Sequence, residues 1–115
     1  MTIKFSSLFK LSSTRIAAAF EIATKAGSID GIKLLKAPSE QGVFIIALTR
    51  AIKGSVARNR MRRRIKAALH AALTERGPLP SHIFLCVTYP AAEKLSYQEL
   101  LTWLKACLWK SQKTK

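Results

Sequence analysis

Hydrophobic and polar positions along the chain predict helices alternating with short strands. The first helix is expected from about Ser13 to Lys25, with Ser12 or Ser13 as its N-cap and Gly27 as the residue that ends it. Its apolar side recurs at helical spacing and consists of Ile16, Ala19, Phe20 and Ala23. This period indicates an amphipathic helix at the start of the folded region.

Two apolar stretches follow the first helix. A short strand region is expected around Ile29 to Ala37, and Pro38 and Gly42 then bracket a turn. The apolar run from Val43 to Leu48 is short and rich in β-branched and aromatic residues. These properties indicate a buried strand.

The second half of the chain predicts a long helix, a strand and a last helix. The long helix should begin at Ser55 and continue to about Glu75, before Gly77-Pro78. A second buried strand is expected from Ile83 to Val87, ended by Pro90.

The last helix has the clearest start signal in the chain. Ser96 and Glu99 have the spacing of a capping box, and Leu95 and Leu100 are placed to form a hydrophobic staple across it. The whole order predicts an α+β sandwich in which helices pack on a sheet. We expect one domain over residues 1–115, frayed at 1–11 and 111–115.

Charge changes this picture more than any other property. Twenty Lys and Arg face six Asp and Glu, which gives a net charge of +14, while 49% of the residues are hydrophobic. The hydrophobic content indicates a folded chain, and the charge indicates a polyanionic partner that removes the self-repulsion. Nucleic acid is the first candidate and an anionic membrane surface is the second.

The remaining composition favours the cytoplasm. Cys86 and Cys107 form no C-x-x-C pair and lie in apolar runs, so they are expected to be buried free thiols in a reducing compartment. No secretory signal is visible, and the longest purely apolar run, Val43 to Leu48, is too short to cross a bilayer.

The positive charge is concentrated between Arg58 and Lys66, where six of nine residues are Arg or Lys and none is acidic. Winding the helix separates two faces. The apolar stripe consists of Ala57, Met61, Ile65, Ala68, Leu69 and Ala72. The opposite side carries Asn59, Arg60, Arg63, Arg64 and Lys66. Arg58 and Arg62 fall near the apolar side, so their guanidinium groups are expected at the rim of the sheet.

These side chains suit a nucleic acid. Guanidinium groups bind phosphate through two hydrogen bonds and stack on exposed bases. Asn59 offers a donor and an acceptor, and Gly54 and Ser55 at the helix start could offer backbone N–H groups to a phosphate. On these grounds the helix could enter a DNA major groove or lie along RNA.

The segment from Ser55 to Lys66 resembles the signature of the bacterial ribonuclease P protein component. In that family R-N-R is followed by a hydrophobic residue, a run of Lys or Arg and another hydrophobic residue. Leu48-Thr49-Arg50 leads into the helix as the family's strand does. Residues 89–92 and 95–100 look like its last strand-to-helix turn. The hydrophobic pair of the family's first helix is matched by Ile16 and Phe20.

This resemblance implies a single-domain α-β-β-β-α-β-α sandwich with a left-handed βαβ crossover, like ribosomal protein S5 domain 2. It implies a cofactor that joins the catalytic RNA of ribonuclease P and promotes removal of the 5′ leader from precursor tRNA, while the RNA itself performs the Mg²⁺-dependent hydrolysis. No membrane and no obligate protein partner are implied. Carried over by position, the RNA-subunit contacts would be Lys53, Arg58, Asn59, Arg60, Arg62, Arg63, Arg64 and Lys66. The leader contacts would be Ile16, Phe20, Arg50 and Tyr89.

Several positions depart from the family pattern, mostly on the leader side. Ala51 stands where a second basic residue usually follows Arg50, and Lys53-Gly54 reverses the common Gly-Lys order. The other departures replace an Arg before the proline, an Arg and a Gly in the central strand, and a frequent aromatic; they are Tyr89, Val43, Ile45 and Ile16. The resemblance is therefore firmest for the basic helix.

Catalysis by the protein itself has little support in the sequence. The six acidic residues are scattered without the paired spacing that two metal ions need, and His70 and His82 have no Cys, Asp or His at ligand or triad spacing. We therefore expect no catalytic residue and no metal ligand in this chain. The main alternative is a structural RNA-binding protein of the ribosomal type with no role in cleavage. A nucleoid DNA binder is a further alternative, and a membrane-surface role for the first helix is disfavoured by its small apolar face.

Overall fold

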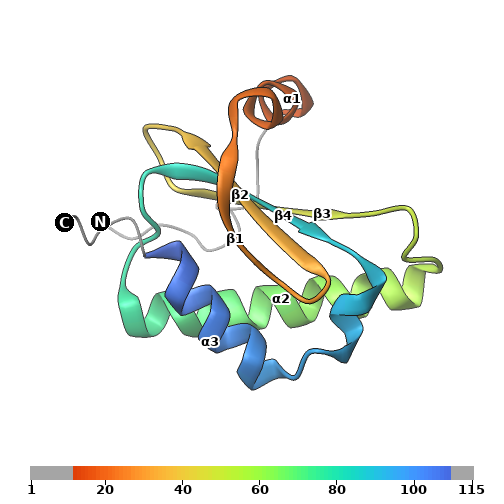
Figure 1. The fold of residues 1–115 in the computed structure, drawn as a ribbon. Coiled ribbons are helices and arrows are strands. Elements are labelled where there is room, and N and C mark those ends of the chain that lie inside the picture. The colour runs from red at the N-terminus through yellow and green to blue at the C-terminus, as the bar shows by residue number, and fades with distance from the viewer. Residues whose placement is uncertain (1–11, 110–115) are drawn as a thin grey trace.

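The computed structural model describes residues 12–109. The terminal segments expected to fray, 1–11 and 111–115, lie outside these residues. The elements follow the order α-β-β-β-α-β-α, with a 3₁₀ turn before the last helix (Figure 1). They are α1 (Ser13–Ile22), β1 (Thr24–Ile29), β2 (Ile32–Pro38), β3 (Val43–Leu48), α2 (Ser55–Arg76), β4 (His82–Thr88), η2 (Pro90–Lys94) and α3 (Tyr97–Leu108).

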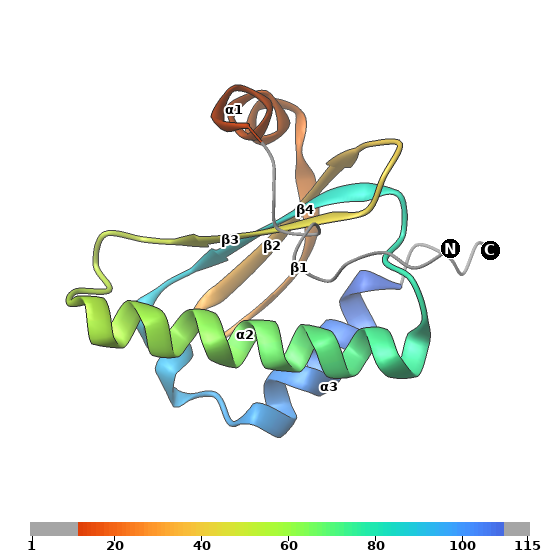
Figure 2. The same cartoon turned by 180° about the vertical axis from the view of Figure 1, so that it is seen from behind.

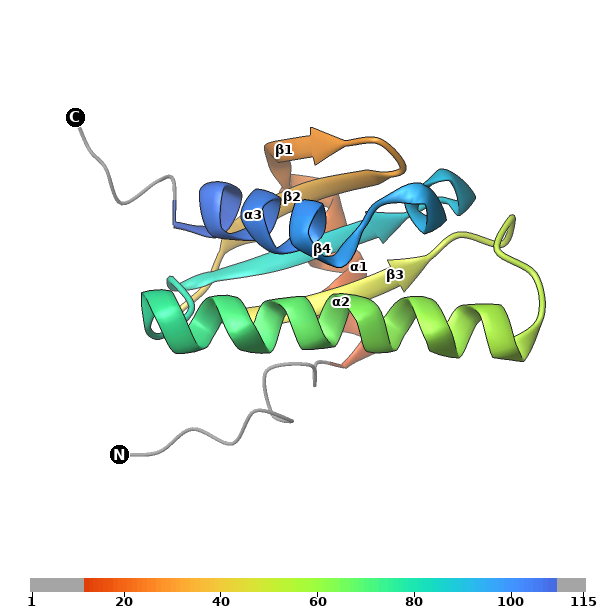
Figure 3. The ribbon, with the colours of Figure 1, turned by 90° about the horizontal axis from the view of Figure 1, so that it is seen from below.

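The four strands form one mixed sheet in the order β1-β2-β4-β3. The pairs β1–β2 and β2–β4 are antiparallel, whereas β3 and β4 are parallel and are connected through α2. When α2 faces the viewer and these two strands point up, β4 lies to the left of β3, so the crossover is left-handed (Figure 3). Almost all βαβ crossovers are right-handed. The resemblance stated above implied the rarer hand, and the fold has it.

The sheet separates two unequal layers (Figures 1 and 2). α2 and α3 cover one face, where the larger core cluster includes Phe44, Phe84 and Leu104. α1 lies alone on the other face and packs with Ala19 over a smaller cluster that includes Ile45 and Leu85. Burial on both faces explains why β3 and β4 are continuous apolar runs without strict alternation.

The prediction for the first helix was wrong at its end. Ser12 caps the helix as expected, its hydroxyl accepting from the Arg15 amide at 3.3 Å, but α1 ends at Ile22. Gly27 lies inside β1, next to an irregularity in the β1–β2 register. A Cβ on Gly27 would lie 2.5 Å from Cys107 Sγ. Glycine thus lets α3 approach β1 closely, and it does not terminate a helix.

The single strand region expected at residues 29–37 is in fact the second arm of a hairpin. β1 and β2 are joined at Asp30-Gly31, and Gly31 has φ +82°. That left-handed conformation favours glycine, and the turn is short enough to join two antiparallel strands. The hairpin supplies the additional strand that the family resemblance implied and the residue pattern did not.

The other helix predictions are confirmed. α2 begins at Ser55 and ends at Arg76, and Gly77 follows with φ +96°. Ser96 and Glu99 form the expected capping box, with bonds of 3.1 Å and 2.9 Å. Both members of the predicted staple, Leu95 and Leu100, are buried in the larger core.

Candidate RNA interface

The apolar side of α2 packs on the sheet as the winding predicted. Met61, Ile65, Ala68, Leu69 and Ala72 are buried, and Ala57 at the start of the stripe is half-buried. This packing fixes the rotation of the helix about its axis. It thereby determines which basic side chains point to solvent and which point back to the protein.

Arg58 points back to the end of the sheet. Its Nη1 donates to the carbonyl oxygens of Thr49 at 3.1 Å and Ile52 at 2.9 Å, and its Nη2 donates to the Leu48 carbonyl oxygen at 3.4 Å. The side chain is half-buried. The prediction that this guanidinium lies at the rim of the sheet is confirmed, and three of its donor hydrogen bonds go to carbonyl oxygens at the end of β3 and in the β3–α2 loop.

Arg60 and Arg64 contact the η2 turn. Arg60 Nη2 lies 3.4 Å from Glu93 Oε2, a pair whose partners are both about half exposed. Such exposed pairs are worth little, about 0–1 kcal/mol. Arg64 donates to the carbonyl oxygens of Glu93, at 3.4 Å, and of Leu95. The sequence pattern did not indicate these contacts, because Glu93 and Leu95 lie far along the chain from α2.

The rest of the predicted set forms what we call the outer basic surface: Lys53, Asn59, Arg62, Arg63 and Lys66. The expected position of the Arg62 guanidinium at the rim of the sheet stays a prediction. At about 100° per residue, the four helical members fall within roughly 100° of one another, on the flank opposite Arg60 and Arg64. Lys53, Asn59 and Arg63 are exposed, while Arg62 and Lys66 are half-buried. No acidic residue lies on α2 before Glu75. The surface therefore presents four cations and one amide without opposite charge on the same helix.

A second candidate surface lies on the α1 face of the sheet. Leu35, Ile45 and Leu85 are covered by α1. Because side chains alternate along a strand, the next row on this face consists of Lys33, Ala47 and Val87. Lys33 is exposed, and Ala47 and Val87 are half-buried, so this row forms an open strip beside α1. Sequence reasoning missed this row, because β4 is apolar almost throughout and a single lysine in β2 does not mark a surface.

The predicted leader contacts lie around this strip. Tyr89 continues the alternation of β4, is 41% exposed, and donates its backbone N–H to the Gly31 carbonyl oxygen at 2.7 Å. Arg50 is exposed and follows β3, whose end pairs with the end of β4. Phe20 is 39% exposed, and Ile16 is half-buried against the smaller core. The structure thus places Arg50 and Tyr89 at the same end of the sheet, just after the paired ends of β3 and β4.

The two flanks of α1 differ. Arg15, Ala18 and Ile22 line a small cavity of about 170 Å³ with Pro38 and Ile83. Phe20 lies on the opposite flank by helical winding, toward the open strip. Two departures from the family pattern, Val43 and Ile45, are buried beneath α1. They belong to the smaller core cluster at the closed part of this face.

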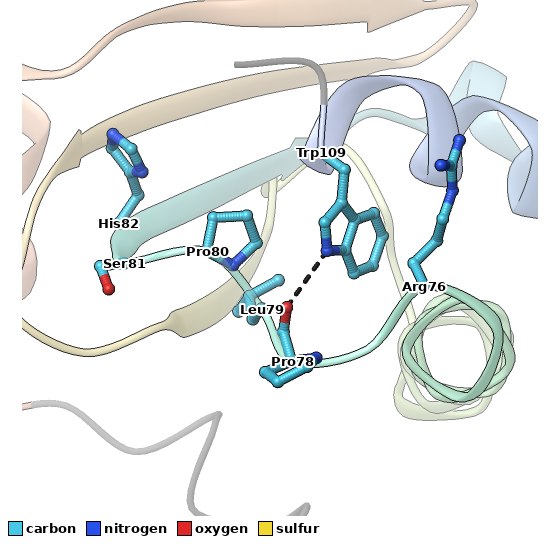
Figure 4. A pocket seen from close by; sticks show the side chains of 7 residues that line it. All are labelled: Arg76, Pro78, Leu79, Pro80, Ser81, His82 and Trp109. Atoms are coloured by element: carbon cyan, nitrogen blue, oxygen red, sulfur yellow. Dashed lines mark hydrogen bonds between the residues drawn. The ribbon is translucent and has the colours of Figure 1, made fainter. Parts of the chain in front are cut away.

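A larger cavity, of about 630 Å³, lies where α2 meets β4 and contains none of the predicted site residues (Figure 4). Trp109 lines it, is buried, and donates its indole N–H to the Pro78 carbonyl oxygen at 3.1 Å. Burial, and then the charge of Lys36, lowers the pKa of His82, whose Nδ1 is buried and unpaired within residues 12–109. Because the Trp109 side chain is buried and its indole N–H is hydrogen-bonded, it belongs to the core and not to an exposed surface.

The cysteines and acids form no reactive cluster in the described chain. Cys86 is buried, and burial raises the pKa of its thiol to about 12, which keeps it protonated. Cys107 is half-buried. No group of three or more His, Cys, Asp or Glu suitable for a metal ion occurs among residues 12–109. None of the helices described there is long and apolar enough to cross a membrane.

Comparison with known proteins gives one consistent answer. The family model described as Ribonuclease P matches residues 8–112. A mutant RNase P protein of Staphylococcus aureus with defective mRNA degradation activity superposes with a TM-score of 0.70 and 9% identity, covering 93% of this chain and 90% of that chain. The RNase P protein of Thermotoga maritima in complex with 1-(4-fluorophenyl)-2-thiourea superposes with a TM-score of 0.69 and 13% identity, covering 86% and 96%. No curated protein sequence matches the chain.

Proposed function

Because the chain belongs to the ribonuclease P protein family, and is thus a subunit of a tRNA-processing endoribonuclease, we propose that it binds two RNA molecules. The outer basic surface binds the catalytic RNA. The open strip beside α1 binds the 5′ leader of precursor tRNA. The observation that carries the first part is the placement of Arg62, Arg63 and Lys66 on one flank of α2. This placement suits a phosphate backbone, since each cation can replace a condensed counterion.

The chemistry of the strip supports the second part. A single-stranded leader offers bases that stack and phosphates that need positive charge. Phe20 and Tyr89 are exposed aromatic side chains, and Arg50 and Lys33 are exposed cations on the same face or at its edge. Val87 and Ala47 supply an apolar sheet surface next to these four side chains. This combination suits unpaired RNA better than a duplex, whose bases are stacked inside.

The protein's role in hydrolysis is indirect. Mg²⁺ held by the RNA subunit would supply the metal-assisted attack of water on the phosphodiester. The residues of this chain would hold the two RNA molecules in register, so that the cleavage site and the RNA's active site coincide. Positive charge near the leader also lowers the repulsion between two polyanions, which matters most when Mg²⁺ is scarce.

Reconstitution tests this proposal directly. A bacterial ribonuclease P RNA and a 5′-extended precursor tRNA are incubated at low Mg²⁺ with and without the protein. We expect faster leader removal with the protein, and a loss of this gain in Arg62→Ala/Arg63→Ala. Arg76→Ala, at the far end of the same helix, is the matched control and should retain the gain. Cleavage that does not respond to the protein would instead support a structural RNA-binding role.

A further inference from the structure

Two arginines of α2 hold the two loops that carry the proposed leader contacts. Arg58 bonds the carbonyl oxygens of Leu48 and Thr49, which directly precede Arg50, and that of Ile52 just after it. One planar guanidinium therefore fixes the loop on both sides of Arg50. An amine could not replace it, because a single ammonium nitrogen does not have the spread of two Nη atoms.

Arg64 has the same relation to Tyr89. It bonds the carbonyl oxygens of Glu93 and Leu95, at the end of the η2 turn that begins at Pro90. The start of the same turn is fixed from the sheet, since the Tyr89 amide donates to the Gly31 carbonyl oxygen at 2.7 Å. A Cβ on Gly31 would lie 2.1 Å from the Ala92 amide nitrogen. The turn after Tyr89 is thus held between the β1–β2 hairpin and α2.

We propose that Arg58 and Arg64 are positioning residues for the leader, not contacts to the RNA subunit. Through them the helix that meets the catalytic RNA also sets the positions of Arg50 and Tyr89. The inference rests on the proposed function, because it takes Arg50 and Tyr89 as leader contacts. It assigns two roles to the basic helix: the outer basic surface binds the RNA subunit, and the two inward-turned arginines position Arg50 and Tyr89.

Lysine substitutions separate the two roles. Arg58→Lys and Arg64→Lys keep the positive charge but lose the two Nη atoms that hydrogen-bond several carbonyl oxygens. A phosphate contact would tolerate this change far better than a positioning role would. The matched control is Arg63→Ala on the exposed flank of the same helix. Circular dichroism and the urea midpoint establish that each variant folds.

Two affinities are measured for each variant: that of the protein for the RNA subunit, and that of the reconstituted holoenzyme for precursor tRNA with a long or a one-nucleotide leader. We expect Arg58→Lys and Arg64→Lys to reduce the preference for the long leader by roughly tenfold, the size of one lost base or phosphate contact. Their affinity for the RNA subunit should stay within about twofold of the original protein. Arg63→Ala should show the reverse pattern.

A double-mutant cycle identifies the residue through which Arg58 acts. If Arg58 positions Arg50, then Arg50→Ala weakens leader binding in the original protein and has little further effect in Arg58→Lys. Arg64→Lys with Tyr89→Ala gives the second cycle, and it decides the question if Arg58→Lys does not fold. Independent, additive effects in the cycles, or a loss of RNA-subunit affinity equal to that of Arg63→Ala, would overturn the inference.

Failure of the underlying function has a different signature. An original protein without any preference for the long leader would refute the leader contact itself, and the positioning role with it. A preserved leader preference that Arg50→Ala and Tyr89→Ala abolish, but the two lysine variants leave unchanged, would refute the positioning role alone.

Discussion

The salt dependence of binding to the RNA subunit counts the cations that contact its phosphates. The structure turns Arg58 and Arg64 to backbone carbonyls and places Arg60 beside Glu93. Lys53, Arg62, Arg63 and Lys66 are the cations of the outer basic surface defined above. The sequence alone, which treated all seven basic residues as contacts, predicts a much steeper dependence.

The two cases differ by a factor that is easy to measure. Each neutralised phosphate of a duplex contributes roughly −0.9 to the slope of log K against log salt. Four cations then give a slope of about −3.6, and affinity falls about 150-fold between 50 and 200 mM salt. Seven cations give about −6.3 and a fall of about 6,000-fold over the same range.

Filter binding or fluorescence anisotropy with the RNA subunit at five or six salt concentrations supplies the slope. Arg63→Ala should reduce it to about −2.7, whereas Arg58→Lys and the control Arg76→Ala should leave it unchanged. A slope near −6 in the original protein would show that the inward-turned arginines also release counterions. A slope near zero would refute the electrostatic account of the outer basic surface altogether.

Three further predictions concern the fold. Gly31→Ala should destabilise the protein by at least about 2 kcal/mol, because residue 31 has φ +82° and an added Cβ would lie 2.1 Å from the Ala92 amide nitrogen. An unchanged urea midpoint would contradict this. Ser96→Ala should cost about 1 kcal/mol by removing the capping box of α3, and a thermal melt that does not move would contradict that role. Burial, and then Lys36, lowers the pKa of His82 below its ordinary value of 6.5, so the unfolded chain takes up this proton first as pH falls. Stability should therefore be fully present above pH 6.5 and decline below it, and urea midpoints at pH 7.5 and 5.5 should differ less in His82→Gln.

Local signals in the sequence were enough to predict most of the elements. The capping box at Ser96 and the glycine at position 77 each act within one or two turns, so their reading needs no knowledge of the tertiary structure. Residues 24–27 were misread because Lys25 and Ala26 are good helix formers and Gly27 commonly follows a helix. Pairing with β2 and the close approach of α3 decide their conformation, and both are tertiary effects. The hand of the crossover leaves no trace in periodicity, so only the family resemblance could imply it.

The candidate site divides in the same way. Helical winding predicted the buried stripe of α2 and the direction of Arg58, because both depend only on 3.6 residues per turn. It could not predict that Arg64 bonds Leu95 or that Arg60 lies beside Glu93, since those partners come from a segment about thirty residues away. Lys33 was missed because a single lysine in a strand has no distinctive pattern until its neighbours on the sheet face are known.

The separation of the core into two clusters has a consequence for motion. α1 contributes one buried residue, Ala19, whereas α2 contributes five within the described structure. Regions with little buried apolar contact open at a lower free energy than the whole molecule unfolds. The amide hydrogens of α1 should accordingly exchange with solvent through a partial opening that leaves those of α2 protected. Such an opening would widen the proposed leader site on the α1 face and would leave the outer basic surface, the proposed contact to the catalytic RNA, undisturbed.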